Sequence, residues 1–314
     1  MTKYYNLNGI LGTEETENSV LCEWNNQFSI KSNDNTTEID FKLIAITHKV
    51  AEKMFGSYQN LYNILITKST IYSYAGVDAE IKISKTDFEK WINSENSEET
   101  NKLLFYYDFQ NLVGSLQNLI QESRFIFCEF YKSLNENSFM LSENPINPNG
   151  MMFASGQLVT TIFSKVNHLF INLVSQLDFI TKIANELENI PNDFKEYPKL
   201  KSNNILYGNL KKLQNIDFTN TVFEKTDDIK LIISLRNEII HNASFENIPK
   251  VYQVFKDNKM IEKFIFIPDS TNGIFDSFKN RNRFFNNEIK LNELLPELVT
   301  EFWKKMEFTI DKLK

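Results

Sequence analysis

Two long stretches with apolar residues at helical spacing constrain the fold of this chain most strongly. In residues 101–134 the apolar side chains recur mostly at intervals of three, four or seven positions, and residues 156–189 repeat the pattern. This spacing gathers apolar side chains on one face of a helix. We therefore expect two long amphipathic helices whose apolar faces pack together, as in a helical bundle.

Composition also favours a mainly helical, globular chain. There are 9 glycines and 7 prolines among 314 residues, too few for the many turns of an all-β fold or for low-complexity linkers. Hydrophobic residues make up 42% of the chain and include 27 phenylalanines, enough for a sizeable core and evidence against wholesale disorder.

Residues 1–95 have a weaker pattern, which indicates a small N-terminal α+β region of unknown role. Alternating apolar and polar residues are typical of strands, and apolar residues at intervals of three or four are typical of a helix. By these criteria we expect strands at 27–31, 38–41 and 78–84, and a helix at 47–66. The polar stretch 93–100 then indicates a connection or the start of a helix.

Residues 96–314 are expected to form a bundle of four or more helices with a short β-hairpin insertion. Besides the two long helices, Thr226 followed by two acidic residues is a good N-cap for a helix that runs to about His241. We also expect a loop at 144–150, a hairpin at 250–267 and a final helix at 288–312.

Charge and cysteine content exclude several classes of protein. The net charge of −7 argues against a broad nucleic-acid-binding face, so any polyanion would need a local basic site. Cys22 and Cys128 are far apart and form no CxxC pair, which argues against a disulfide framework and a zinc site. The N-terminus lacks a signal-peptide pattern and no apolar run reaches membrane-spanning length. We expect a cytoplasmic protein with no membrane segment, metal or cofactor, since Gly-rich phosphate loops are absent as well.

Three histidines are available for catalysis, and only His241 stands in a suggestive setting. His48 and His168 are expected to be ordinary helix or packing residues. His241 follows Arg236 by five positions, and Arg236 is one of only four arginines in the chain. On a helical wheel, five isoleucines fall within about 60° of Arg236; they are Ile229, Ile232, Ile233, Ile239 and Ile240.

This placement predicts that Arg236 lies near the middle of an apolar stripe. A buried arginine requires a carboxylate, a carbonyl group or a bound anion. Asn237 lies four residues before His241 and can orient its imidazole, while Glu238 is placed to favour the protonated form. An alternative is purely structural, with Arg236 bridging to a core acid such as Asp178 or Glu186 and His241 capping the helix.

The segment from Arg236 to His241 resembles the RNxxxH form of the Rx4–6H motif of the HEPN superfamily. HEPN domains are all-α bundles, many of which act in prokaryotic toxin–antitoxin and antiviral defence systems. The resemblance implies a metal-independent endoribonuclease that cleaves single-stranded RNA to 2′,3′-cyclic phosphate ends. It also implies a homodimer through the motif-bearing helix, with two motifs facing one cleft, and an antitoxin or other regulatory partner.

Roles follow from the resemblance for three residues. His241 would act as general acid or base, Arg236 would bind the phosphate, and Asn237 would orient the imidazole or contact the phosphate. A second basic cluster, Lys279, Arg281 and Arg283, has neighbouring phenylalanines that could stack on RNA bases; the more ordinary alternative for this cluster is a solvated loop.

Two other hypotheses about the function remain open at this point. The first is a catalytically inactive HEPN-like module that binds a nucleotide or a protein partner through the same cleft. The second is a structural helical protein in which the motif occurs by chance.

Overall fold

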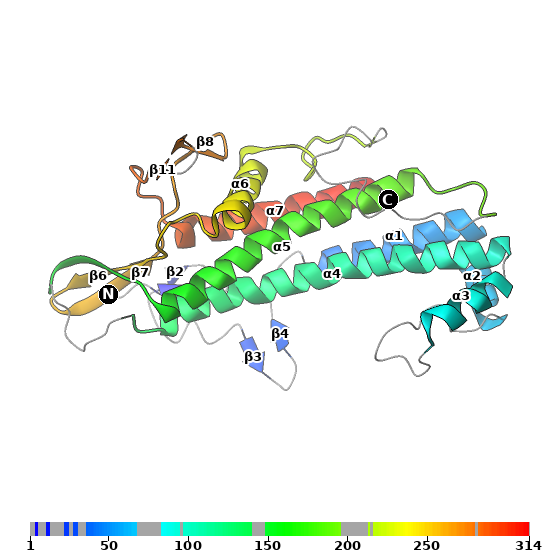
Figure 1. The fold of residues 1–314 in the computed structure, drawn as a ribbon, viewed down its shortest axis with the longest axis horizontal. Coiled ribbons are helices and arrows are strands. Elements are labelled where there is room, and N and C mark those ends of the chain that lie inside the picture. The colour runs from blue at the N-terminus through cyan, green and yellow to red at the C-terminus, as the bar shows by residue number, and fades with distance from the viewer. Residues whose placement is uncertain are drawn as a thin grey trace. The chain divides into compact units, whose positions relative to one another are not determined.

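The computed structural model describes residues 36–67, 83–94, 97–139, 148–195, 213, 216–279 and 282–313, together with the backbone of four short N-terminal strands. Seven helices lie in this described part and make it mainly α, as the sequence predicts. They are α1 (Thr36–Phe55), α2 (Tyr58–Thr67), α3 (Lys85–Ser94), α4 (Glu98–Glu136), α5 (Gln157–Glu188), α6 (Asp227–Asn242) and α7 (Leu291–Leu313) (Figure 1).

The strands are short and antiparallel. The largest sheet has three strands in the order β5 (Gly150–Ala154), β6 (Val251–Lys256) and β7 (Lys259–Phe264). The other strands form two-stranded hairpins: β1 (Tyr4–Tyr5) with β2 (Leu11–Gly12), β3 (Cys22–Trp24) with β4 (Phe28–Ile30), β8 (Ser270–Thr271) with β9 (Ile274–Phe275), and β10 (Ser277–Phe278) with β11 (Asn282–Arg283).

Two compact units divide the chain, and each is assembled from segments that are distant in the sequence. Unit 1 comprises Met1–Thr36, Leu119–Ser175 and Asn220–Met306, and unit 2 comprises Thr37–Asn118, Gln176–Thr219 and Glu307–Lys314. Both sides of residue 95 belong to unit 2. Within the polar stretch 93–100, α3 ends at Ser94 and α4 begins at Glu98, so the stretch includes the start of a helix.

The two long helices predicted from periodicity are confirmed as α4 and α5. Their apolar stripes are buried, because each helix turns the same face inward over many turns. In the unit 1 part of α5, the buried apolar residues are Val159, Ile162, Phe163, Val166, Leu169, Phe170, Leu173 and Val174. The final helix is also confirmed, as α7.

The N-terminal predictions are only partly right. The strand expected at 38–41 is wrong, because these residues lie in α1. Ile39, Leu43, Ile46 and Val50 are fully buried at intervals of four and three, a helical period that a four-residue window cannot reveal. The helix expected over 47–66 is two helices, broken at Gly56, whose φ of 81° is not helical.

The remaining N-terminal predictions have different outcomes. The strand expected at 27–31 is confirmed as β4, which pairs with β3. Most of the strand expected at 78–84 lies outside the described residues, and the last two positions, 83 and 84, are not in a strand.

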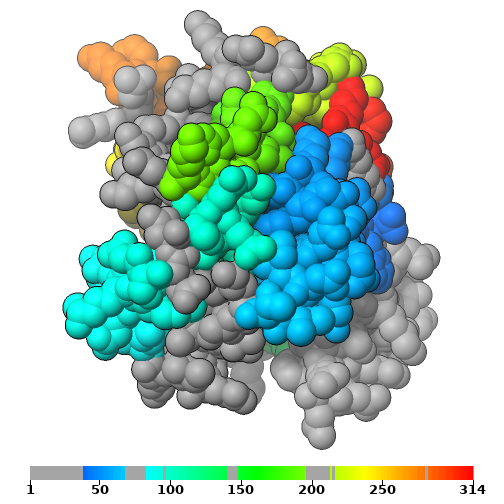
Figure 2. All heavy atoms as spheres, turned by 90° about the vertical axis from the view of Figure 1, so that its right-hand side faces the viewer, coloured from blue at the N-terminus to red at the C-terminus, as the bar shows by residue number. Residues whose placement is uncertain are grey.

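Unit 2 is stabilised by polar contacts in addition to its apolar core. Figure 2 looks onto this unit, where α1 and α2, in blue, lie beside the first turns of α4, in cyan. Lys42 of α1 donates to Glu307 and Asp311 of α7, at 2.6 Å each. Asn101 of α4 donates to the carbonyl oxygen of Phe194 at 2.7 Å, which fixes the chain after α5.

In unit 1 the hairpin predicted at 250–267 is confirmed as β6 and β7, but a third strand was not foreseen. β5 follows directly on the predicted loop 144–150, most of which lies outside the described residues, and pairs with β6 from Gly150 to Ala154. Pairing with β6 gives the backbone of this short strand its hydrogen-bond partners, although Met151 and Phe153 are exposed.

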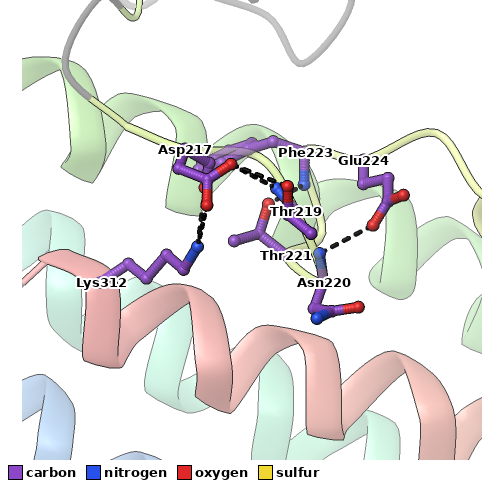
Figure 3. A network of polar contacts seen from close by, with 7 residues as sticks. All are labelled: Asp217, Thr219, Asn220, Thr221, Phe223, Glu224 and Lys312. Atoms are coloured by element: carbon purple, nitrogen blue, oxygen red, sulfur yellow. Dashed lines mark hydrogen bonds and ion pairs between the residues drawn. The ribbon is translucent and has the colours of Figure 1, made fainter.

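The segment that leads into α6 is organised by side-chain hydrogen bonds (Figure 3). Asp217 accepts from Lys312 at 2.6 Å and from the N–H and O–H of Thr219. These donors lower the pKa of the Asp217 carboxyl to about 2, chiefly through Lys312. The N–H of Asn220, which has a φ of 61°, donates to Glu224 at 2.7 Å. The chain therefore enters α6 through a fixed turn.

Candidate active site on helix α6

Helix α6 forms as its sequence predicts. Thr226 is the N-cap, with extended backbone angles. Asp227 and Asp228 place negative charge in the first turn, where it interacts favourably with the helix dipole and stabilises the helix. The Thr226 hydroxyl itself makes no capping bond. The helix ends at Asn242, and Ala243 adopts the left-handed conformation that terminates many helices.

Arg236 does not occupy the middle of the apolar stripe, contrary to the sequence prediction. The buried residues of α6 are Ile229, Leu231, Ile232, Leu235 and Ile239, and Ile240 is 51% exposed. Leu231 and Leu235 widen the stripe on one side, which moves its centre about 60° away from Arg236. Arg236 is accordingly half-buried at the edge of the stripe, where its charge can reach water.

The guanidinium of Arg236 is held by its neighbour in the motif. Nη1 of Arg236 donates to Oδ1 of Asn237 at 3.1 Å. Among the described residues of unit 1, Arg236 forms no ion pair; Asp178 and Glu186, named as alternative partners, belong to unit 2. The positive charge of Arg236 is thus uncompensated beside an exposed surface.

His241 and Asn237 are both exposed on the last turns of α6. Among the described residues, no hydrogen bond or ion pair involves His241, which differs from the expected hydrogen bond with Asn237. The Asn237 carbonyl oxygen is taken by Arg236 instead. Within the described part of the chain, the exposed imidazole is therefore not held in one orientation by a side-chain partner.

Glu238 contacts an arginine rather than His241, whose protonated form it was expected to favour. Its Oε1 accepts from Nη2 of Arg283, and its Oε2 accepts from Nδ2 of Asn242 at 2.9 Å. The side chains of Arg283 and Glu238 are 11% and 16% exposed. This pair is more protected from water than an ordinary surface ion pair.

The second basic cluster is divided by the structure. Lys279 is exposed, and its ammonium lies 5.3 Å from the ring centre of Phe278, which is 55% exposed. Arg281 lies outside the described residues. Arg283 is withdrawn from solvent into its ion pair with Glu238, so it is not an open phosphate-binding group. Nothing in the local sequence announces this pairing, because the partners are 45 residues apart.

Around the axis of α6 the motif residues follow one another in a clear order. With Arg236 at 0°, Asn237 lies at about 100°, His241 at about 140° and Glu238 at about 200°. The exposed arc thus begins at a cation and passes an amide and an imidazole. It ends at Glu238, whose carboxylate pairs with Arg283.

Comparison with family models, with curated proteins and with solved structures gives no match to this chain. The described residues contain no group of three or more His, Cys, Asp or Glu side chains that could hold a metal ion. Nor does the described part include a helix that is long and apolar enough to cross a membrane.

Proposed function

We propose that this protein is a metal-independent endoribonuclease of the HEPN type that acts on single-stranded RNA. The observation that carries the proposal is the exposed arc of α6. Among the described residues, Arg236 has no ionic partner and His241 has no hydrogen-bond or ionic partner. They lie about 140° apart around the last helical turns, with Asn237 between them. A phosphodiester is a substrate that needs both an anion-binding group and a proton-transfer group.

The roles of the side chains follow from transesterification chemistry. The ribose 2′-oxygen attacks the adjacent phosphorus, the bond from phosphorus to the 5′-oxygen breaks, and a 2′,3′-cyclic phosphate and a 5′-hydroxyl result. His241 removes the 2′-hydroxyl proton or protonates the departing 5′-oxygen, because imidazole exchanges protons near neutral pH. Arg236 and the amide of Asn237 bind the phosphate oxygens and stabilise the charge that develops on them. Single-stranded RNA is required, since a flexible backbone lets the 2′-oxygen reach in-line geometry.

A homodimer through α6 would complete the site. Ile240 lies about 40° from Arg236 on the helix and is 51% exposed, so an apolar side chain adjoins the motif on the solvent side. Burial of Ile240 against a second copy would place two motifs at one two-fold axis and double the local positive charge. A toxin or defence effector, restrained by an antitoxin, is the biological role that fits such an activity.

RNA cleavage in the presence of EDTA tests the proposal. We expect wild-type protein to cleave single-stranded RNA and to leave 2′,3′-cyclic phosphate ends, detectable by mass spectrometry. His241→Ala and Arg236→Ala should lose the activity. His168→Ala is the matched control, because His168 is also an exposed histidine of unit 1, where it lies 3.4 Å from Glu122. Equal loss in all three variants, or intact RNA with wild type, would refute the assignment.

A non-catalytic HEPN-like binding module is the second candidate. The observation that favours it is the bond from Arg236 to Asn237, which occupies the amide that was expected to orient His241. An unoriented imidazole suits ligand binding better than proton transfer. For this candidate, RNA or a nucleotide should bind with Arg236-dependent affinity and be recovered intact.

A further inference from the structure

We propose that Arg283 is a positioning residue, which fixes a nucleic-acid-binding hairpin beside the motif of α6 through its ion pair with Glu238. The inference rests on the proposed function and extends it, by naming the group that holds the bases of the single-stranded RNA. The hairpin is formed by β10 and β11, and the binding residues are Phe278 and Lys279. Together with β8 and β9 it is called the arm (described residues 270–279 and 282–283).

The arm is attached to an ordered turn. The Asp269 carboxylate accepts from the backbone N–H groups of Asn286 and Asn287, at 2.8 and 3.1 Å. The N–H of Asp269 donates to the carbonyl oxygen of Phe284 at 2.8 Å, and the carbonyl oxygen of Asp269 accepts from Asp276 at 2.9 Å. Because Asp269 is 4% exposed, these bonds are shielded from water. The backbone and the carboxylate of one buried residue, Asp269, therefore fix the chain on both sides of the arm.

Two anchors then fasten the arm along α6. At the first, Gly273 packs so closely that a Cβ there would overlap the carbonyl oxygen of Asp227, and Ser234 donates to the Gly273 carbonyl oxygen at 2.8 Å. At the second, Arg283 pairs with Glu238. Lys230, Ser234 and Glu238 follow one another every four residues, so both anchors lie on one side of the helix. The two side-chain anchors, Ser234 and Glu238, are about 6 Å apart along the helix and set the direction of the arm.

The second anchor needs both of its charges. Nε and Nη1 of Arg283 are buried and have no hydrogen-bond partner among the described residues, so Glu238 alone compensates this guanidinium there. Loss of the Glu238 charge would leave a largely buried cation, which is strongly unfavourable. Because Glu238 lies about 60° from His241 around the helix, this anchor also adjoins the motif.

The arm presents an aromatic ring and a cation to solvent. Phe278 is 55% exposed and Lys279 lies over its ring at 5.3 Å. An exposed ring stacks on any base, and an adjacent ammonium pairs with a phosphate, which together give the sequence-tolerant binding of single strands. The arm therefore supplies affinity for the strand, while Arg236 and His241 act on the phosphodiester.

Steady-state cleavage kinetics, together with RNA binding by the His241→Ala protein, test the role of Arg283. We expect Arg283→Met to raise KM and weaken binding of a labelled single-stranded RNA about tenfold, with kcat nearly unchanged, because one base-stacking contact is lost. Phe278→Ala and Lys279→Met should act in the same direction, and neither removes a core contact. The reversed pair, Glu238→Arg with Arg283→Glu, should restore most of the affinity.

The outcomes separate this inference from the proposed function. The matched control is Lys304→Met, which removes one charge from an exposed pair with Glu301 on α7 and should change nothing. If wild type cleaves RNA but Arg283→Met and Phe278→Ala leave KM and binding unchanged, the positioning role is refuted and the nuclease stands. If RNA binds through Phe278 and Arg283 but is never cleaved, the nuclease is refuted and the role of the arm stands. If RNA neither binds nor is cleaved, both are refuted.

Discussion

The buried carboxyl of Glu186 should make the stability of unit 2 depend on pH near neutrality. Glu186 lies on α5, and its Oε2 is buried with no hydrogen-bond partner among the described residues. Burial raises the pKa of Glu186 from its ordinary 4.5 to about 7; the charge of Asp108 raises it further, and Lys182 opposes the change. Burial raises the pKa of Asp108 as well.

The direction of the effect follows from proton binding. Between pH 4.5 and about 7 the folded chain binds a proton at Glu186 that the unfolded chain has released, so stability falls as pH rises through this window. At about 1.4 kcal/mol per pH unit, the difference between 4.5 and about 7 costs at most about 3 kcal/mol once the group is ionised. Glu186→Gln removes this cost, because an amide stays neutral at every pH.

Urea unfolding followed by circular dichroism at pH 5 and pH 8 measures the effect. We expect Glu186→Gln to unfold like wild type at pH 5 and to be more stable by up to about 3 kcal/mol at pH 8. Asp108→Asn should give a smaller gain at pH 7, since it removes the neighbouring charge. Glu52→Gln on α1 is the control, because Glu52 is exposed. A gain for Glu186→Gln that is absent at pH 8, or equal at both pH values, would refute the reasoning.

Three other substitutions test the packing of unit 1. Gly273→Ala should lower the melting temperature by several degrees, because φ is 75° and the new methyl group would overlap α6; an unchanged melting curve would contradict this close approach. Burial lowers the pKa of Lys263 to about 8. As pH rises from 8 to 10.5, the free energy of unfolding of wild type in urea titrations should therefore increase relative to that of Lys263→Met. Parallel pH profiles of the two proteins would show that the ammonium is not desolvated. Arg236→Met should leave the unfolding free energy within about 0.5 kcal/mol and abolish RNA cleavage, because Arg236 is half-buried and, among the described residues, bonds only to Asn237. A large loss of stability would favour a structural role.

The long helices could be predicted from sequence because their signal is repeated. α4 and α5 carry many turns of the same apolar pattern, so single exceptions do not hide the period. The segment 38–41 shows the opposite case, since four residues match a strand as well as one turn of a helix. β5 was missed because its place in the sheet depends on β6, about a hundred residues later.

The position of Arg236 shows the limit of a wheel drawn from isoleucines alone. Counting Leu231 and Leu235 moves the centre of the stripe, and both are buried. The motif itself could be found from the sequence, since its residues are consecutive on one predicted helix. The burial of each side chain could not, because it depends on which elements cover α6, among them β9 and the turn at Gly273.

Glu238 pairs with Arg283 and not with His241, so the prediction that it would interact with its neighbour on the helix was wrong. His241 lies three residues away on the same helix, whereas Arg283 lies 45 residues away. An exposed imidazole keeps its hydration when it is left alone, so its lack of a partner costs little. A guanidinium that is 11% exposed has lost most of its hydration and stays charged at every ordinary pH, so it requires the carboxylate far more strongly. The carboxylate therefore goes to the more desolvated cation. Among the described residues, His241 is left without a hydrogen-bond or ionic partner, at the exposed surface of α6.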